Sequence, residues 1–531
     1  MRDHLIAVDV GTGSARAGVV SRTGRLLARR EHPILLSRPS DERGEHNSQD
    51  IWEACCIAVK AALGEAGIAP EAIAGIGFDA TCSLVLRDRS DQPLCLNEEE
   101  GFDTIAWLDH RATAEAEECG DLDHPVLHHN GRVISPEAEI PKLMWLKRHR
   151  PDLWQRLGSA FDLADFLTWK ATGSTARSLC TLTSKWTFFG HSKPGWQQDF
   201  LNRVGLDDLV ARAGLPQEAV AVGKSVGTLS TEAAEALGLM AGIPVAAGMV
   251  DAYAGALGVL GSTDLSDPDL NHVAMIGGTS SCLIALRPQP LYGFSLWGPY
   301  FGAIFPDLWL MEAGQSATGA LLNHIVRSHA EGGEPSIDNH RRIIDRIAAL
   351  RAEEGVSFGQ KINVLPDFHG NRSPFADPNL TGTISGLTLD ASFDGLCRLY
   401  WRTCVGIVLG LRQIVEMLRD NGHGGNGENG SGPLRLHLTG GHVKNPLLVE
   451  LYAEATGCDL VVADDTDAVL IGTAINAAAA SGLYADLAQA GAAMGVKGRA
   501  VRSNPAMKPC YDRDYRRFLA MQRHRAELNE L

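Results

Sequence analysis

The chain contains the same local unit twice, and this duplication limits its possible folds more than any other feature of the sequence. In the first copy, the apolar run Leu5 to Val10 is followed by the turn Gly11-Thr12-Gly13-Ser14 and a second apolar run, Ala17 to Val20. The second copy runs from His272 to Leu286 around the turn Gly277-Gly278-Thr279-Ser280-Ser281. Apolar runs separated by glycine-rich turns predict paired β-strands. A unit that begins each half of a chain indicates a duplicated domain, in which each half offers one turn to a cleft between them.

Both halves are predicted to be α/β layers. Asn47 or Ser48 can cap a helix, and a strand is expected from Ile73 to Phe78. In the second half, Leu436 to Gly441 predicts a strand that ends in paired glycines, and Val443 to Gly457 predicts a helix. The segment from Tyr511 to Leu531 suits a surface helix docked by its apolar face. Strands and helices that alternate in this way favour a layered α/β protein.

The composition excludes several classes of partner. Lys plus Arg number 48 and Asp plus Glu number 64, which gives a net charge of −16 in a chain of 531 residues. This charge repels a phosphate backbone, so we expect no nucleic-acid partner. The 11 cysteines form no C-x-x-C pair, and many lie in apolar runs. They are typical of reduced, buried thiols in a cytoplasmic protein.

Two segments bear on export and membranes. Met1 to His4 lead directly into a strand, without the apolar region and cleavage site of a signal peptide. Gly242 to Leu260 is the most membrane-like stretch, but it is rich in Gly and Ala and carries Asp251 near its middle, where a carboxylate is costly in lipid. We therefore expect a cytoplasmic protein without membrane contact, and a buried strand, turn and helix in this stretch.

Three familiar motifs are excluded by their context. Gly11, Gly13 and Gly18 superficially match a dinucleotide fingerprint, but that motif opens a helix, and here a strand follows. Gly223-Lys224-Ser225 resembles the end of a P-loop, but Glu218 stands where the first glycine is required. The chain has no H-E-x-x-H pair. The dehydrogenase and zinc-enzyme hypotheses therefore lack the motifs that would normally support them.

The first turn has the chemistry of a phosphate site. Glycines let backbone N–H groups approach an anion, the hydroxyls of Thr12 and Ser14 add donors, and Asp9 can hold hydrated Mg²⁺. For one such turn, the alternative is a tight hairpin that needs glycine for its backbone geometry. Two such turns favour the phosphates of a nucleotide. Gly440 and Gly441 precede a predicted helix, which suits an adenine or ribose site or an ordinary βα turn.

Five motifs, taken together and in order, resemble the FGGY family of carbohydrate kinases. They are D-V-G-T-G-S from Asp9, G-I-P-V-A-A-G-M-V-D-A from Gly242, G-G-T-S-S from Gly277, E-A-G-Q-S-A-T-G from Glu312 and L-T-G-G-H-V-K-N from Leu438. The resemblance extends along nearly the whole chain. It implies two ribonuclease H-like, actin-like ATPase domains, residues 1–262 and 263–531, that close on ATP and a sugar or polyol. Members of this family often form homodimers, so a homodimer is also an expectation.

The resemblance also implies roles for individual residues. Asp251 would be the general base that accepts the proton of a sugar hydroxyl as it attacks the γ-phosphorus of ATP. A helix N-cap is the alternative role for this aspartate. Asp9 would orient Mg²⁺ through water, while Arg16 adds charge or is an exposed strand residue. The residues implied for ATP are Gly11, Thr12, Gly13, Ser14, Gly278, Thr279, Ser280, Gly319, Asn323, Gly440, Gly441 and Asn445.

The sugar pocket is expected mainly from the first half of the chain. Trp107 beside Asp109 suits a polyol, which offers C–H faces and hydroxyl donors, or is a buried ring beside a surface ion pair. Lys185 and Glu312 resemble the residues that ribulokinases place around an open-chain ketose. The segment Thr81 to Val85, which includes Cys82, resembles that of the D-ribulokinase-type subgroup. The resemblance therefore implies D-ribulose as the acceptor.

Other acceptors and one other class of function stay open. L-ribulose and ribitol differ from D-ribulose in features that depend on side-chain positions of a fraction of an ångström. The alternative class is a nucleotide-dependent scaffold of the actin-like superfamily that has lost phosphotransfer. Such a scaffold would have no use for Asp251, Trp107 and Lys185 together.

Overall fold

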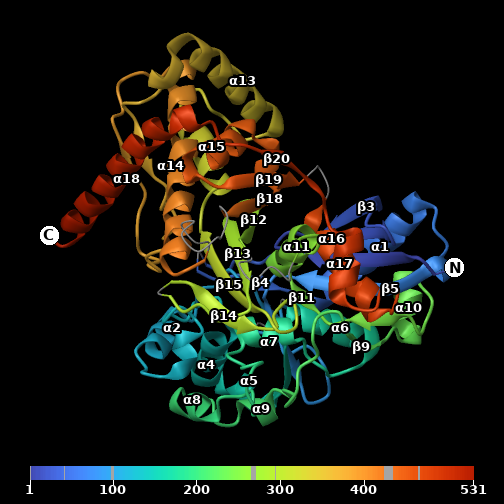
Figure 1. Cartoon of the computed structure of the whole chain (residues 1–531). Coiled ribbons are helices and arrows are strands. Elements are labelled where there is room, and N and C mark those ends of the chain that lie inside the picture. Colours follow the sequence, from blue (N-terminus) through green and yellow to red (C-terminus); the bar gives the residue numbers. More distant parts are fainter. Residues whose placement is uncertain are drawn as a thin grey trace.

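The computed structural model describes residues 2–40, 42–96, 101–264, 271–293, 295–423, 434–463 and 467–531. Its framework is two seven-stranded sheets, one from each half of the chain (Figure 1). Both sheets have the same arrangement at their centre. In the first, β1 pairs antiparallel with β2 and parallel with β5; in the second, β12 pairs antiparallel with β13 and parallel with β18. The predicted duplication is therefore confirmed, and the fold is that of two ribonuclease H-like, actin-like domains.

The strands of the first sheet are, in spatial order, β3 (Leu26–Pro33), β2 (Ser14–Ser21), β1 (His4–Val10), β5 (Ile73–Ala80), β10 (Pro244–Ala246) and β9 (Ser225–Thr228), with β11 (Met249–Val250) also paired to β5. Those of the second are β14 (Trp297–Phe301), β15 (Trp309–Gln315), β13 (Ser281–Arg287), β12 (His272–Gly277), β18 (Arg435–Gly440), β19 (Asp459–Ala463) and β20 (Gly498–Val501). Two smaller sheets comprise β4 (Glu45–His46), β7 (Thr104–Ile105), β6 (Leu84–Asp88) and β8 (Leu157–Asp162), and β16 (Asn363–Leu365) with β17 (Thr383–Ser385).

Helices cover both sheets and form one additional lobe. Those of the first half are α1 (Ser48–Ala66), α6 (Leu163–Thr172), α10 (Thr231–Leu237) and α11 (Asp251–Leu260). The helical lobe beside β4 and β6–β8 contains α2 (Thr113–Gly120), α3 (Pro125–His128), α4 (Glu139–His149), α5 (Pro151–Arg156), α7 (Leu179–Lys185), α8 (Gln198–Arg203) and α9 (Leu209–Arg212). Those of the second half are α12 (Gly319–Ser328), α13 (Ile337–Glu354), α14 (Phe393–Asp420), α15 (Pro446–Thr456), α16 (Ala468–Ala480), α17 (Leu487–Met494) and α18 (Lys508–Asn529).

Helices α11 and α16 join the two halves at the centre of the molecule (Figure 1). Helix α16 belongs to the second half but packs on β1 and β5 of the first sheet, and α11 packs on β12 of the second. A β-carbon on Gly472 would lie 1.8 Å from the carbonyl oxygen of Ala254, and one on Gly258 would lie 2.0 Å from that of Ala468. Glycine is therefore required at both positions for the helices to approach so closely. The boundary expected between residues 262 and 263 stays a prediction.

Several local predictions are confirmed and one is displaced. Asn47 caps α1, because its Oδ1 accepts the backbone N–H of Gln49 at 2.9 Å. The strand, turn and helix expected over residues 242–260 are present as β10, β11 and α11. The helix expected from Val443 begins instead at Pro446, because Asn445 caps it and a 3-10 turn occupies Gly441–Lys444. All 11 cysteines are free of disulfides.

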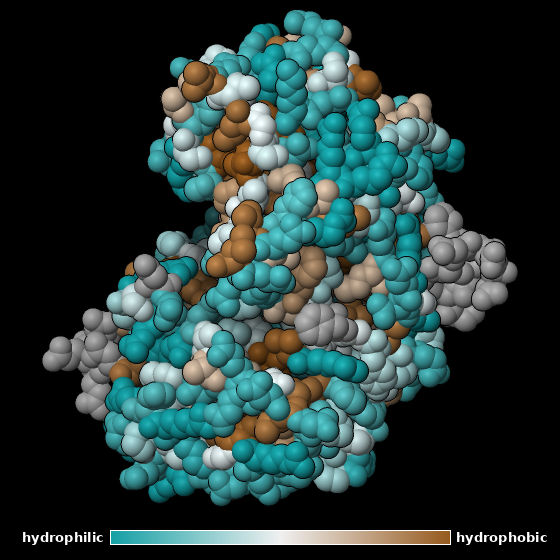
Figure 2. Space-filling model, turned by 90° about the vertical axis from the view of Figure 1, so that its left-hand side faces the viewer, coloured by the Kyte–Doolittle hydropathy of each residue, from teal (hydrophilic) through white to brown (hydrophobic). Residues whose placement is uncertain are grey.

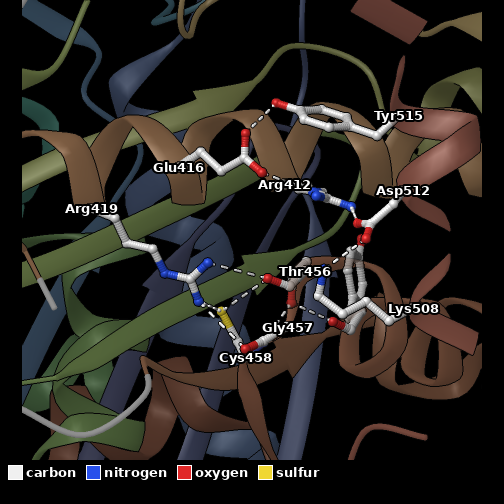
Figure 3. Close-up of polar contacts among 10 residues, drawn as sticks. Arg412, Glu416, Arg419, Thr456, Gly457, Cys458, Lys508, Asp512 and Tyr515 are labelled. Carbon is white, nitrogen blue, oxygen red and sulfur yellow. Dashed lines mark hydrogen bonds and ion pairs between the residues drawn. The ribbon is translucent and has the colours of Figure 1, made fainter. Parts of the chain in front are cut away.

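The predicted C-terminal helix is confirmed as α18, which docks on α14. Phe518 is buried, and Arg412 and Glu416 of α14 bind Asp512 and Tyr515 of α18 at 2.8 and 2.6 Å (Figure 3). Within the described residues, the search for a helix long and apolar enough to cross a lipid bilayer finds none. The face shown in Figure 2 is largely hydrophilic, with an indentation between its upper and lower lobes.

Candidate active site

A cavity of about 740 Å³ lies between the two halves. Its walls come from the turns after β1 and β12, the end of β18, the start of α11 and the helical lobe. Most of the residues that the sequence predicted for ATP and sugar meet here. They are Gly11, Thr12, Cys82, Trp107, Lys185, Asp251, Gly278, Thr279, Ser280, Glu312, Gly440 and Gly441.

The sheet topology explains why the acidic residues converge. In the parallel pairing of β1 with β5, Asp9 lies directly opposite Asp79, and β11, which ends immediately before Asp251, pairs with the same end of β5. Because the carboxyl ends of parallel strands meet at one edge of a sheet, three aspartates from distant parts of the chain come together there. Asp251 lines the cavity, whereas Asp9 and Asp79 are fully buried and lie outside its lining. Asp251 is the first residue of α11, and its Oδ1 accepts the backbone N–H of Ala252 at 2.7 Å.

Burial controls the charge of these aspartates. It raises the pKa of Asp9 to about 7, although an ion pair with Arg16 lowers it and the negative charges of Asp467 and Asp251 raise it further. Burial also raises the pKa of Asp251, opposed by the N–H of Ala252 and by the positive charge of Arg16. Arg16 is therefore part of the site rather than an exposed strand residue.

The residues around Asp9 fit a divalent cation held through water. Both carboxylate oxygens of Asp9 are buried and, apart from the ion pair with Arg16, have no hydrogen-bond partner among the described residues. In the part of the chain that the structure describes, no three acidic, His or Cys side chains could bind a metal ion by themselves. Mg²⁺ would therefore need phosphate oxygens and water as its remaining ligands, which is its usual preference.

Each glycine turn is closed by a backbone hydrogen bond, over four residues in the first turn and three in the second. The N–H of Gly11 donates to the carbonyl of Ser14 at 3.0 Å, and that of Gly278 donates to the carbonyl of Ser280 at 2.8 Å. Gly440 has a φ of 86°, and a β-carbon there would lie 2.4 Å from the carbonyl oxygen of Gly277. The ends of β12 and β18 thus approach each other so closely that only glycine fits.

The part of the cavity that is predicted to bind the acceptor, here named the acceptor end, is lined by charged and aromatic side chains. Glu312 on β15 is 7% exposed, and it accepts the hydroxyl of Tyr253 at 2.8 Å and the thiol of Cys282 at 3.3 Å. Burial opposes the charge of Lys185, but the neighbouring Cys82 and Glu312 raise the pKa of Lys185 well above its ordinary value. Lys185 is therefore a cation at neutral pH.

Cys82 and Trp107 line the same end. Burial raises the pKa of Cys82 to about 12, so its thiol is protonated at neutral pH. The backbone N–H of Trp107 donates to Oγ of Ser83 at 3.1 Å, and its indole Nε1 donates to Oγ1 of Thr12 at 2.9 Å. Trp107 is therefore held between Ser83 and the first glycine turn.

Some predicted residues do not line the cavity. Asp109 is fully buried, and its carboxylate accepts Nε of Arg111 at 2.8 Å and the N–H of Gly44 at 2.8 Å. Asp109 therefore forms structural contacts, and its ion pair with Arg111 is buried rather than at the surface as the alternative supposed. A direct contact with the sugar stays a prediction. The other predicted residues outside the lining are Asp9, Gly13, Ser14, Gly319, Asn323 and Asn445.

Three of these residues form hydrogen bonds within the protein. The N–H of Gly319 donates to the carbonyl of Gly278 at 3.0 Å. Oδ1 of Asn323 is bonded to the ring of His340 at 2.9 Å, and Oδ1 of Asn445 accepts the N–H of Leu447 at 3.1 Å. A direct role in binding ATP stays a prediction for all three.

The cavity also contains charged residues that the sequence reasoning missed. Asp467 caps α16 and pairs with Arg29 at 3.1 Å and with Arg16 at 3.6 Å, while Glu137 and Arg372 line the acceptor end. Nothing local in the sequence marks Arg29, which is one of several charges on a surface strand. Asp467 could have been found as a helix cap, because an alanine-rich helix pattern follows it.

Comparison with known proteins identifies relatives along the whole chain. The N-terminal and C-terminal domain models of the FGGY family of carbohydrate kinases match residues 4–258 and 273–481. A human FGGY carbohydrate kinase domain-containing protein is 40% identical over 99% of this chain and 97% of its own length. A D-ribulokinase of Saccharomyces cerevisiae is 34% identical over 90% of this chain and 72% of its own. The structure of xylulose kinase from Rhodospirillum rubrum superimposes with a TM-score of 0.80 at 22% identity, covering 99% of this chain and 100% of that one.

Proposed function

Because the chain belongs to the FGGY family of carbohydrate kinases, we propose that it transfers the γ-phosphoryl group of ATP to a pentulose, with D-ribulose as the preferred acceptor and D-ribulose 5-phosphate as the product. One observation carries this proposal. Asp251, both glycine turns and the pair Lys185 and Glu312 line a single cavity between the two halves. A nucleotide and a small polyol can therefore lie end to end within reach of one carboxylate.

In the proposed reaction, a sugar hydroxyl attacks the γ-phosphorus of ATP while its proton passes to the carboxylate of Asp251. The bond between the γ-phosphorus and the bridging oxygen breaks, and ADP leaves with the electron pair. The turns at Gly11 and Gly278 would hold phosphate oxygens through backbone N–H groups. Arg16 faces the same end and offsets the negative charge there.

Mg²⁺ is expected beside Asp9. When bound, it supplies positive charge that offsets the charge of the phosphates. Asp9 would hold it through water, and the ion pair with Arg16 fixes the carboxylate in the protein without it. Neither a homodimer nor a cytoplasmic location enters this mechanism, and both stay predictions.

One relative supports D-ribulose as the acceptor, and the lining of the cavity supports an open-chain ketose. The relative from Saccharomyces cerevisiae is named for D-ribulose, and it matches 90% of this chain. Thr81 and Cys82 of the T-C-S-L-V segment line the acceptor end of the cavity beside Lys185. Lys185 is a cation that can donate hydrogen bonds to the oxygens of an open-chain ketose.

The test is the release of ADP from MgATP with a panel of D-ribulose, L-ribulose, D-xylulose, L-xylulose, ribitol, D-arabitol, glycerol and water, compared as kcat/KM. We expect D-ribulose to lead by about tenfold or more. If another polyol leads, phosphoryl transfer stands and the assignment of the acceptor is wrong. If no acceptor exceeds water while the protein binds nucleotide, a non-catalytic actin-like scaffold replaces the kinase.

A further inference from the structure

A charged pair from opposite halves of the chain closes the acceptor end of the cavity. Glu137 lies just before α4 in the helical lobe, and Arg372 lies between β16 and β17 of the second half. Nη2 of Arg372 is 3.0 Å from Oε1 of Glu137 and 3.3 Å from Oε2. Both side chains line the cavity. This end of the site is therefore complete only when the two halves come together.

Aromatic rings and a strand hold Arg372 beside the acceptor. Its guanidinium lies 5.8 Å from the ring centre of Trp107 and 5.6 Å from that of Trp297. Trp297 on β14 pairs directly with Glu312 on β15. Two residues along β15, a β-carbon on Gly314 would lie 3.8 Å from Cδ of Arg372. The side chain of Arg372 thus packs against β15, the strand that carries Glu312.

The pair is a neighbour of Lys185 and Glu312, the two residues predicted to bracket the sugar. All four side chains line the cavity together with Asp251. The pKa of Arg372 responds to Glu312 as well as to Glu137, and the pKa of Glu137 responds to Lys185 as well as to Arg372. Glu137 and Arg372 therefore belong to the part of the cavity in which the acceptor is expected.

The charges at this end cancel. Lys185 and Arg372 are cations, and Glu137 and Glu312 are the acidic residues among them. Burial would raise the pKa of Glu137, but Arg372, His110 and Lys185 together outweigh it and lower that pKa to about 2, so Glu137 is ionised at neutral pH. Paired charges of this kind offer many hydrogen bonds to hydroxyl groups but no unmatched cation to a carboxylate.

We propose that Glu137 and Arg372 are specificity-determining residues, which bind a neutral acceptor from both halves at once and disfavour acceptors that carry a carboxylate. This inference rests on the proposed kinase function and adds to it the class of acceptor. Each side chain keeps hydrogen-bonding capacity beyond the pair itself, because a guanidinium has five N–H donors and a carboxylate about four acceptor sites. Because the rings of Trp107 and Trp297 lie against the guanidinium of Arg372, the edge of the guanidinium is left to bind the sugar.

The test compares Glu137→Gln, Arg372→Met and the double variant with wild type, using the acceptor that leads the panel. Arg346→Met is the matched control, since Arg346 binds Asp394 through two hydrogen bonds of 2.7 Å on the surface of the second half. We expect each single variant to raise the KM for the acceptor about tenfold. The KM for ATP should change less than about twofold, and the double variant should be no worse than Arg372→Met, because the pair acts as a unit.

The specificity claim is tested with D-ribonate, a five-carbon sugar acid. In Glu137→Gln, Arg372 loses its matching charge, so inhibition by D-ribonate should strengthen about tenfold relative to wild type. Arg372→Lys keeps the charge, and we expect it to recover part of the acceptor affinity that Arg372→Met loses.

The outcomes separate this inference from the proposed function. If wild type phosphorylates no member of the panel, the proposed function fails. If wild type is active but the variants keep the KM for the acceptor and the inhibition by D-ribonate, only the inference fails. A lower thermal midpoint and kcat with an unchanged KM would also overturn it, because the pair would then merely hold the halves together.

Discussion

The indole Nε1 of Trp107 donates a hydrogen bond of 2.9 Å to Oγ1 of Thr12, although the two residues are 95 positions apart. Thr12 belongs to the first glycine turn, at the end of the cavity that we assign to phosphate. Trp107 follows β7 and contacts the acceptor end through Arg372. The bond therefore couples the position of the phosphate turn directly to the wall of the acceptor site.

This coupling predicts that Trp107→Phe weakens the binding of both substrates. Phe keeps most of the apolar surface but cannot donate to Thr12, and a hydrogen bond of this kind is worth about 1 kcal/mol. We expect the KM values for the sugar and for ATP each to rise about threefold to tenfold, with a smaller change in kcat. Steady-state kinetics with each substrate varied in turn measures both effects.

The control is Trp196→Phe, which removes an indole hydrogen bond of 2.8 Å to the carbonyl of Pro216 in the helical lobe. Trp196 does not line the cavity, so the Trp196→Phe substitution should lower the thermal midpoint without changing either KM. A Trp107→Phe variant that raises only the KM for the sugar would show that the ring and the turn are independent.

Asp251 should impose an acidic limb on the pH profile. Only its ionised form can accept a proton, and burial raises its pKa above the ordinary value, so activity is lost as the pH falls through that raised pKa. We expect log(kcat/KM) to begin to fall, as the pH is lowered, at a higher pH than the titration of an ordinary aspartate would give.

Asp251→Asn should lower kcat by about a thousandfold while nucleotide binding persists. Near-normal turnover of this variant would contradict the assignment, and Asp394→Asn on the surface serves as the control.

The negative charge of Asp9 should lower the stability of the folded protein while it favours the binding of a cation. Its pKa is about 7 in the folded protein against an ordinary value of 3.8, so the folded state binds this proton more tightly and stability is lost as the pH rises between the two values. Asp9→Asn removes the buried charge. We therefore expect its thermal midpoint, measured without nucleotide, to exceed that of wild type at pH 8 and the difference to shrink at pH 5.

The same variant should need more Mg²⁺. We expect the Mg²⁺ concentration for half-maximal activity to rise about tenfold, because a neutral amide holds a hydrated cation less well than a carboxylate. A variant that is less stable than wild type at pH 8 and has an unchanged Mg²⁺ requirement would contradict both parts of the argument.

The sequence predicts the parts of the site that local chemistry marks. The turns at Gly11 and Gly278 could be predicted because strands flank a run of glycines and hydroxyls, a pattern that few other structures require. Asp251 is conspicuous as a carboxylate inside an apolar stretch, but its role as the general base comes from the resemblance to the kinase family. The end of β18 was predicted, but the following helix begins three residues later than expected, because Asn445 and Pro446 define a stronger start than Val443.

Other parts depend on tertiary contacts that no local pattern carries. Asp109 looks like a sugar ligand beside Trp107, and only the fold shows that Arg111 and Gly44 use its oxygens. Arg372 becomes part of the cavity because the loop that carries it crosses to Glu137, 235 positions earlier in the chain. Such pairings are set by how two domains meet, and the spacing of residues within one domain does not contain that information.

The ion pairs that dock α18 on α14 should differ in their contributions to stability. The side chains of Arg402 and Asp514 are 5% and 1% exposed and pair at 2.6 Å. Those of Arg412 and Asp512 are 15% and 29% exposed. Figure 3 draws the second pair. Removing one partner of a buried pair leaves an uncompensated charge and costs about 3 kcal/mol or more. Partly exposed pairs contribute about 1 kcal/mol or less.

We therefore expect Arg402→Met to lower the free energy of unfolding by about 3 kcal/mol and Arg412→Met by about 1 kcal/mol or less, measured by urea unfolding followed by circular dichroism. Neither arginine lines the cavity between the halves, so kcat/KM at 25 °C should stay within about twofold of wild type for both variants. Equal losses of stability in the two variants would show that burial does not set the strength of these pairs. A loss of activity without a loss of stability would show instead that the docking of α18 is transmitted to the cavity.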